Sequence, residues 1–184
     1  MKKIQFLTIL CFTGIVLTGC SDDNDPPQLI NDEEVITTLT ATLTPNTIGA
    51  TNITLQTQDL DGDGPNAPVV TVSGNLIAGT VYAGTIVLLN ETVSPAEDIT
   101  EEVEEESDEH QFFFVVGGLD ATVMATNNDI NGNPLGTQFT LTAGAAGTGT
   151  LTFTLRHDLK KPNSGLADAG GETDISATFN VTIE

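Results

Sequence analysis

Apolar and polar residues alternate with a period of two along most of this chain, which is the pattern of strands with one buried face. In the last such run the apolar positions are Ile175, Ala177, Phe179, Val181 and Ile183. Eight further runs of strand length lie at 35–43, 53–55, 69–73, 81–89, 111–116, 121–125, 138–142 and 150–155. Clusters of Gly, Asn and Pro separate the runs, as turns between strands require. The pattern predicts an all-β protein, an antiparallel β-sandwich of immunoglobulin-like size, formed by residues 33–184.

One segment departs from this period. Residues 94–97 read SPAE, with Ser before Pro and Glu three positions after Ser, which is typical of a helix start with a capping box. The acidic stretch 98–109 follows, with Ile99 and Val103 at helical spacing. Carboxylates four residues apart repel one another, so a long helix is not expected. The sequence therefore predicts one short acidic helical insertion that ends near His110.

The first 19 residues have the three parts of a secretory signal peptide: two lysines, an apolar stretch over 4–17 and small residues before Cys20. The apolar stretch is shorter than the roughly 20 residues that a transmembrane helix needs. Residues 17–20, LTGC, resemble the lipobox of bacterial lipoproteins, in which cleavage precedes the cysteine and its sulfur receives a diacylglyceryl group. The alternative is an ordinary signal peptide with an incidental cysteine. We expect lipid attachment at Cys20, with acyl chains such as palmitate holding the protein in the membrane.

Residues 20–32 are expected to form an acidic flexible tether, because they contain Pro26-Pro27 and little apolar surface. The opening of this segment, SDD at 21–23, resembles an acidic signal that directs lipoproteins to the cell surface in one large Gram-negative phylum. An ordinary acidic linker is the alternative. We predict an outer-membrane lipoprotein and favour exposure at the cell surface over a periplasm-facing position.

Charge and residue content exclude several function classes. The chain has 26 acidic and 5 basic residues, a formal net charge of −21 at pH 7, which argues against nucleic-acid binding. No glycine-rich loop opens a helix to hold phosphate, and no nucleophile elbow is present. One Tyr and no Trp leave few aromatic side chains to line a sugar site. The sequence therefore predicts a protein that is not an enzyme.

The two histidines of the chain both have acidic neighbours. His110 closes the acidic stretch, with Glu106 four positions earlier, and His157 lies at the end of a strand run with Asp158 next to it. Imidazole and carboxylate groups without thiolate suit zinc or copper, so these four residues are a candidate transition-metal site. The alternative is that His110 is a cation at a helix end and His157 a buried, hydrogen-bonded side chain.

Residues 59–64, DLDGDG, match the opening of a calcium loop, in which carboxylates at alternate positions bind the ion. Asp59, Asp61 and Asp63 are therefore candidate calcium ligands. The twelfth position is Val70 where an EF-hand has Glu, and no helices are predicted on either side, so this is not an EF-hand. A similar stretch, DINGNP, lies at 129–134. Asp, Asn and Gly also favour plain turns, which is the alternative for both stretches.

Three stretches together resemble a known family. Residues 85–114 (TIVLLNETVSPAEDITEEVEEESDEHQFFF), DLDGDGP upstream and RHDLKKPNSGLADAGGETDI downstream are similar to small bacterial lipoproteins named type 1 periplasmic binding fold superfamily proteins. The likeness covers about 33–184. It implies a lipoprotein encoded beside an outer-membrane transporter of the TonB-dependent type, and it implies no catalytic residues. The chain lacks the length and the alternating helices of a two-lobed α/β binding protein, so the expected fold stays a β-sandwich.

Two functions follow as hypotheses. The first is a lipid-anchored cell-envelope binding protein, an accessory to outer-membrane nutrient or metal uptake, that binds zinc or copper through histidine and carboxylates. The second is a structural or adhesive β-sandwich module that calcium stiffens and that has no role in transport.

Overall fold

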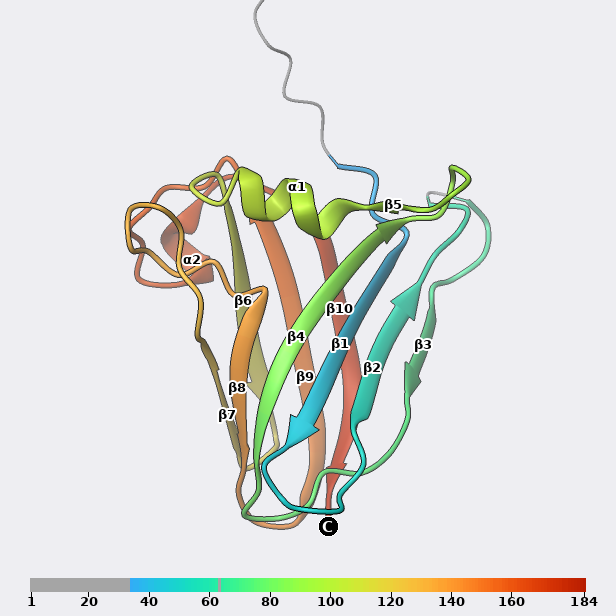
Figure 1. Ribbon diagram of the computed structural model, residues 1–184, viewed down its shortest axis with the longest axis vertical. Coiled ribbons are helices and arrows are strands. Elements are labelled where there is room, and N and C mark those ends of the chain that lie inside the picture. Colours follow the sequence, from blue (N-terminus) through green and yellow to red (C-terminus); the bar gives the residue numbers. More distant parts are fainter. Residues whose placement is uncertain (1–33, 63) are drawn as a thin grey trace, which may run out of the picture. The chain divides into compact units, whose positions relative to one another are not determined.

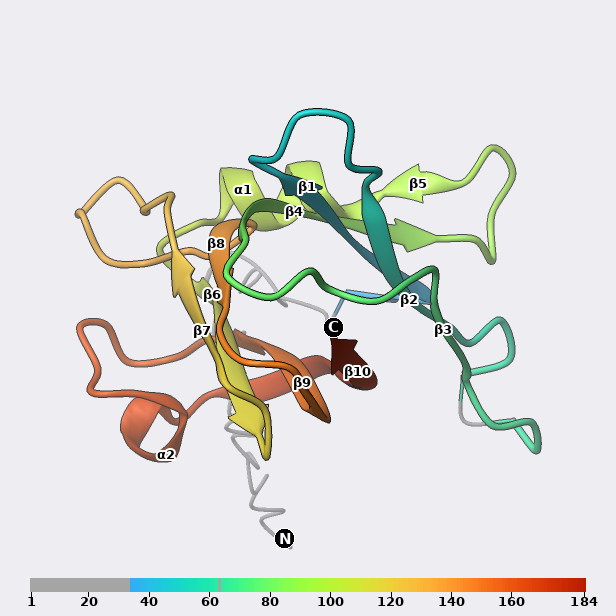
Figure 2. The same ribbon diagram turned by 90° about the horizontal axis from the view of Figure 1, so that it is seen from below.

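Two antiparallel sheets pack face to face in the computed structural model, which describes residues 34–62 and 64–184 (Figure 1). Figure 2 looks along the strands and separates the two layers. The larger sheet has the strand order β3-β2-β1-β4-β8-β7, with β5 paired to β4. Its strands are β1 (Thr38–Pro45), β2 (Ile53–Gln58), β3 (Val69–Val72), β4 (Val81–Asn90), β5 (Glu97–Asp98), β7 (Ala121–Ala125) and β8 (Gln138–Ala143). The smaller sheet, in the order β10-β9-β6, consists of β6 (His110–Gly117), β9 (Gly147–His157) and β10 (Glu172–Ile183).

The prediction of an all-β antiparallel sandwich is confirmed, and each of the nine predicted runs overlaps a strand. Only two short helices, α1 (Ile99–Glu105) and α2 (Leu166–Ala169), accompany the strands in the described part of the chain. The predicted signal peptide, the lipid attachment at Cys20 and the tether lie outside the described residues. Within those residues no helix combines the length and the apolar character needed to cross a membrane.

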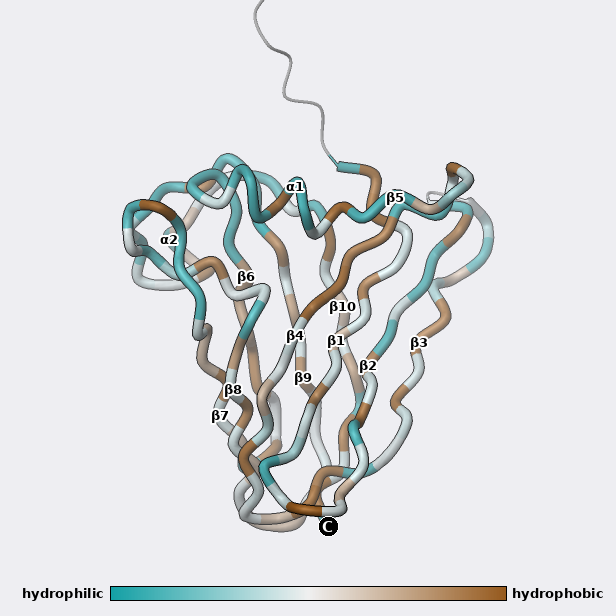
Figure 3. Tube along the Cα trace, in the orientation of Figure 1, coloured by the Kyte–Doolittle hydropathy of each residue, from teal (hydrophilic) through white to brown (hydrophobic). Residues whose placement is uncertain are grey.

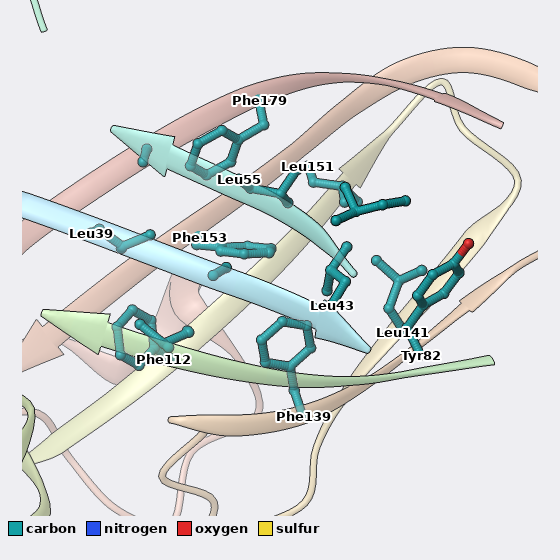
Figure 4. Close-up of a cluster of buried hydrophobic side chains, with 14 of the residues drawn as sticks. Leu39, Leu43, Leu55, Tyr82, Phe112, Phe139, Leu141, Leu151, Phe153 and Phe179 are labelled. Carbon is teal, nitrogen blue, oxygen red and sulfur yellow. The ribbon is translucent and has the colours of Figure 1, made fainter. Parts of the chain in front are cut away.

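The core lies between the sheets and is built by the alternation that the sequence predicts. Along β10, Phe179 and its neighbours at every second position are buried, whereas the residues between them are partly or fully exposed. The ring of Phe153 on β9 meets the ring of Phe179 edge to face, with centroids 5.7 Å apart, and Phe139 on β8 contacts Phe153 at 5.5 Å (Figure 4). Such aromatic pairs stabilise the core beyond the burial of their area.

The short helix begins later than its sequence predicts. Residues 97–98 form β5 and pair with the end of β4, so the helix starts at Ile99 and Ser94 does not cap it. Asp98 is the N-cap instead, and its carboxylate accepts a hydrogen bond of 3.0 Å from the backbone N–H of Thr100. Ile99 and Val103 are buried, which holds α1 across the strand ends at one end of the sandwich (Figure 1). The chain at this end consists mostly of hydrophilic residues (Figure 3).

The opposite end of the sandwich is closed by backbone hydrogen bonds. The N–H of Leu76, in the connection between β3 and β4, donates to the carbonyl of Thr182 at 2.8 Å, and the N–H of Glu184 donates back to Leu76 at 2.8 Å. The end of β10 is thereby joined to a segment that leads into the larger sheet.

Candidate metal centre

The two histidines lie side by side at the end of the smaller sheet that α1 covers. In the register of β6 with β9, His110 at the start of one strand is opposite His157 at the end of the other. Their rings stack with centroids 4.5 Å apart and an interplanar angle of 24°. The side chains of His110 and His157 are only 0% and 4% exposed. Both histidines predicted as ligands are therefore brought together in a buried position.

A β-bulge adds a carboxylate to this pair. Thr173 pairs with Arg156 and Ile175 pairs with Leu155, so Asp174 is an extra residue in β10 with no partner position on β9. A bulge of this kind redirects the side chain of the extra residue. The side chain of Asp174 is 0% exposed, with its oxygens 3.8 Å from Nδ1 of His157 and 3.9 Å from Nε2 of His110.

The second buried carboxylate belongs to Glu34, just before β1. Its side chain is 3% exposed, with Oε1 3.0 Å from Nε2 of His110 and Oε2 3.5 Å from Nδ1 of His157. Thr37, three residues later, fixes this segment, because its N–H and hydroxyl both donate to the carbonyl of Leu89, at 2.9 and 3.0 Å. Glu34 thus reaches from the larger sheet to the histidines of the smaller one.

One ligand atom from each of Glu34, His110, His157 and Asp174 lies within 4.8 Å of all the others, so this cluster could hold a metal ion. Most of the separations between nitrogen and oxygen, 3.5 to 3.9 Å, are too long for hydrogen bonds. Ligand atoms that surround a tetrahedral zinc ion at about 2.0–2.1 Å lie about 3.3 Å from one another, close to these values. Among the described residues, Oε2 of Glu34 and Nε2 of His110 are buried polar atoms with no aligned hydrogen-bond partner.

The backbone fixes the tautomer of His110. Its Nδ1 lies 3.1 Å from the carbonyl oxygen of Glu106, and a carbonyl can only accept, so Nδ1 carries the hydrogen. In the neutral ring the lone pair is then on Nε2, which faces the carboxylates of Glu34 and Asp174. A lone pair directed at carboxylates needs a proton or a metal ion between them. A backbone carbonyl that orients the far nitrogen of a ligand histidine is common in metal sites.

The charges of the cluster also favour a proton or a metal ion between these groups. Burial by itself lowers the pKa of His110, but its contact with Glu34 and the charge of Asp174 outweigh this effect and raise the pKa above its ordinary value of 6.5. Burial by itself raises the pKa of Glu34, and the contact with His110 reverses this and leaves the pKa below 4.5. With both carboxylates ionised and both imidazoles neutral, the cluster would carry a charge of about −2, which one divalent cation would neutralise.

The other two predicted ligands have different positions. Glu106 contributes its backbone carbonyl, and its carboxylate does not belong to any group of converging metal-ligand atoms found among residues 34–62 and 64–184. Asp158 lies on the outer side of His157, where its Oδ1 is 3.9 Å from Nε2 of the ring. Oε2 of Glu109 is also 3.9 Å from this nitrogen, and the three residues form a second group of converging ligand atoms.

Glycine is required where the chain passes the end of β9. Gly171 has φ +68°, in the region that favours glycine, and a Cβ there would lie 2.1 Å from the carbonyl oxygen of His157. Asp158, the residue after His157, also has a positive φ of 50°. The backbone therefore has a positive φ both directly after His157 and just before Glu172, its partner on β10, and a larger residue at 171 would clash with the backbone of His157.

The two candidate calcium loops differ in the structure. Asp129 accepts hydrogen bonds from the N–H groups of Asn131 and Asn133, at 2.9 and 2.8 Å, and its other oxygen lies 3.2 Å from the ammonium of Lys161. The ammonium group of Lys161 thus lies where a metal cation would bind, and this stretch forms a turn. In the first loop Asp61 accepts hydrogen bonds from Asn66, and Asp63 lies outside the described residues.

Glu34 and Asp174 were not predicted from the sequence. The alternation of β10 places Asp174 on the same side as exposed Ser176, and only the bulge turns it inward. Glu34 adjoins Glu33 at the start of the domain and has no spacing relation to either histidine. One signal was available: opposite strand ends that carry the only two histidines suggest a register that joins them, and nearby acidic residues are then candidate ligands.

The fold and the centre together define a small β-sandwich with a buried histidine–carboxylate cluster at one end. Comparisons of the chain with protein-family models, with curated proteins and with solved structures found no match. The likeness to small lipoproteins noted in the sequence therefore stays a prediction.

Proposed function

We propose that this protein is a lipid-anchored binding protein of the outer membrane that holds a transition metal, as an accessory to nutrient or metal uptake. The observation that carries the proposal is the convergence of two buried histidines with two buried carboxylates, Glu34 and Asp174, within 4.8 Å. A protein that buries two carboxylates without a cation loses stability, so such a cluster is expected to serve binding.

The ligand set favours zinc or copper. Imidazole nitrogens suit both metals, carboxylates complete a site for zinc, and no thiolate takes part. Four protein side chains can complete a tetrahedral shell, and at most 4% of each is exposed. Such a closed site holds an ion, whereas catalytic zinc keeps one position for water. Binding and transfer of a metal are therefore favoured over catalysis.

Titration calorimetry with zinc tests this proposal. The wild type should bind one ion tightly at pH 8, and affinity should fall as the pH drops through the pKa of His110, because a proton then occupies Nε2. Since this pKa is raised above 6.5, the loss should begin at a higher pH than for an ordinary histidine. Glu34, with a lowered pKa, stays ionised over this range and does not compete.

His110→Ala and His157→Ala should each weaken zinc binding at pH 8 by more than the roughly 10- to 100-fold that loss of an outer-shell partner costs. Glu105→Gln is the matched control, because it removes an exposed acidic charge from α1 and should leave affinity almost unchanged. Equal binding by all four proteins would refute the proposal. Melting that depends on calcium and is unaffected by the histidine variants would favour the alternative, a structural module with calcium at Asp59, Asp61 and Asp63.

The lipid anchor has its own test. Cells that express the wild type and are fed radioactive palmitate should yield a labelled protein, whereas Cys20→Ser should yield none, because no other cysteine remains after cleavage before residue 20. The wild type should also fractionate with the outer membrane. Persistent labelling of the Cys20→Ser protein would contradict the anchor and leave the metal centre as a separate question.

A further inference from the structure

The ring of His157 faces two groups of carboxylates at once. Its Nδ1 faces the inner cluster, with Glu34 at 3.5 Å and Asp174 at 3.8 Å. Its Nε2 faces the outer pair, with Glu109 and Asp158 each at 3.9 Å. The inner carboxylate side chains are 3% and 0% exposed, whereas those of Glu109 and Asp158 are 48% and 68% exposed. One imidazole thus separates a buried ligand group from a solvent-facing one.

A neutral imidazole has one lone pair, so it binds an ion through only one nitrogen at a time. When Nε2 binds an ion, the hydrogen is on Nδ1 and points toward the carboxylates of Glu34 and Asp174. When Nδ1 binds an ion, the hydrogen is on Nε2 and points toward Glu109 and Asp158. In both states the hydrogen of the ring therefore faces carboxylates, and the two metal positions exclude each other.

From this arrangement we infer that Glu109, Asp158 and Nε2 of His157 form an entry site, which captures a divalent cation from solvent and passes it to the inner cluster. The inference rests on the proposed function and adds the route by which the ion arrives. An ion from solvent meets the exposed carboxylates first, and its transfer exchanges these ligands for Glu34, Asp174 and His110. As the ion reaches Nδ1, the hydrogen there is released to water, and Nε2 takes a hydrogen from water on its exposed side, so the ring has the same charge before and after transfer.

The chain segments that carry the two exposed carboxylates are joined by a buried lysine. Glu109 lies in the turn between α1 and β6, and Asp158 lies at the start of the loop after β9. Lys161 in that loop donates to the carbonyl of Ser107 at 2.6 Å and to the carbonyl of His110, and its side chain is only 5% exposed. The fold thereby fixes the turn of Glu109 against the loop of Asp158, which prepares the outer group before an ion binds.

Stopped-flow measurement of Zn²⁺ transfer from a chromophoric chelator tests the inference on the full protein. The Glu109→Gln/Asp158→Asn variant should take up zinc about tenfold or more slowly at pH 8, within the range in which local charge changes association rates. Its equilibrium affinity should stay within about threefold of the wild type. Glu101→Gln/Glu105→Gln removes two exposed charges from α1 and should change the rate much less. Melting curves of both variants check that they are folded.

Four other results would each contradict either the entry site or the proposed function. Equal slowing in both variants would overturn the inference, because only the general negative field would then matter. A loss of equilibrium affinity with an unchanged association rate would also overturn it, since Glu109 and Asp158 would be ligands of the final site. If the wild type itself binds no zinc in a histidine-dependent way, the proposed function fails. Tight binding by the wild type with an unchanged uptake rate in Glu109→Gln/Asp158→Asn would refute the entry site alone.

Discussion

Replacement of Asp174 with asparagine is expected to raise the melting temperature of the metal-free protein and to remove most of the stabilisation that zinc gives the wild type. In the metal-free cluster the carboxylates of Glu34 and Asp174 present oxygens within 4.8 Å of each other. At an effective dielectric constant of about 20, their repulsion is on the order of 3 kcal/mol. The contact of His110 with both carboxylates offsets part of this repulsion. The amide has a similar shape and no charge, so metal-free Asp174→Asn should melt about 2–4 °C higher at pH 8, which corresponds to a net gain of about 1 kcal/mol.

Zinc should stabilise this variant less than it stabilises the wild type. A ligand at 100 times its Kd stabilises the folded state by about 2.7 kcal/mol. For a domain of this size that corresponds to a rise of about 5–10 °C in the wild type. Asp174→Asn lacks one anionic ligand, so zinc should raise its melting temperature by less than about 2 °C.

Thermal melting with and without zinc measures both effects. Glu172→Gln is the matched control, because Glu172 is an exposed acidic residue on the same strand. It should match the wild type in both conditions. A full zinc shift in Asp174→Asn would show that Asp174 is not a ligand, and a lower metal-free melting temperature would show that its charge stabilises the fold.

The largest change in stability is expected from Phe179→Ala. The side chain of Phe179 is completely buried and its ring contacts Phe153 edge to face. A Phe→Ala change in a core typically lowers the free energy of unfolding by about 3–5 kcal/mol, out of a total of about 5–15 kcal/mol for a domain. Chemical denaturation should show this loss. Asn180→Ala changes the exposed neighbour on the same strand and should alter stability by less than about 0.5 kcal/mol. Equal midpoints for the two variants would place Phe179 outside the core.

Alternation alone was sufficient to predict the fold class, because a period of two assigns one face of each strand to the core. The prediction of the helix start was wrong, because backbone pairing between nearby segments changed the local structure. The sequence around Ser94 has the features of a helix start, yet residues 97–98 gain backbone pairing with β4, and the helix start moves to Ile99. Local propensities do not include such pairing between segments.

The candidate metal centre was predictable only in part. His110 and His157 were candidate ligands because each has acidic neighbours, and the register of β6 with β9 places them opposite each other. Asp174 escaped prediction because a bulge inverts the direction that alternation assigns to it. Glu106 was chosen by helical spacing, and that spacing does bring it to His110, but through its carbonyl. Spacing predicts which residues meet, and not which of their atoms do.

The two ends of the sandwich are closed by different chemistry. At one end, backbone hydrogen bonds join Leu76 to Thr182 and Glu184, and these bonds do not change with pH or with the ions in solution. At the other end, the carboxylate of Glu34, which precedes the larger sheet, meets the histidines of the smaller sheet. The attraction between the layers there depends on what lies between these groups: nothing, a proton or a metal ion. The end closed by backbone hydrogen bonds should therefore stay closed in all conditions. Only the end covered by α1 should loosen when metal is removed from the solution.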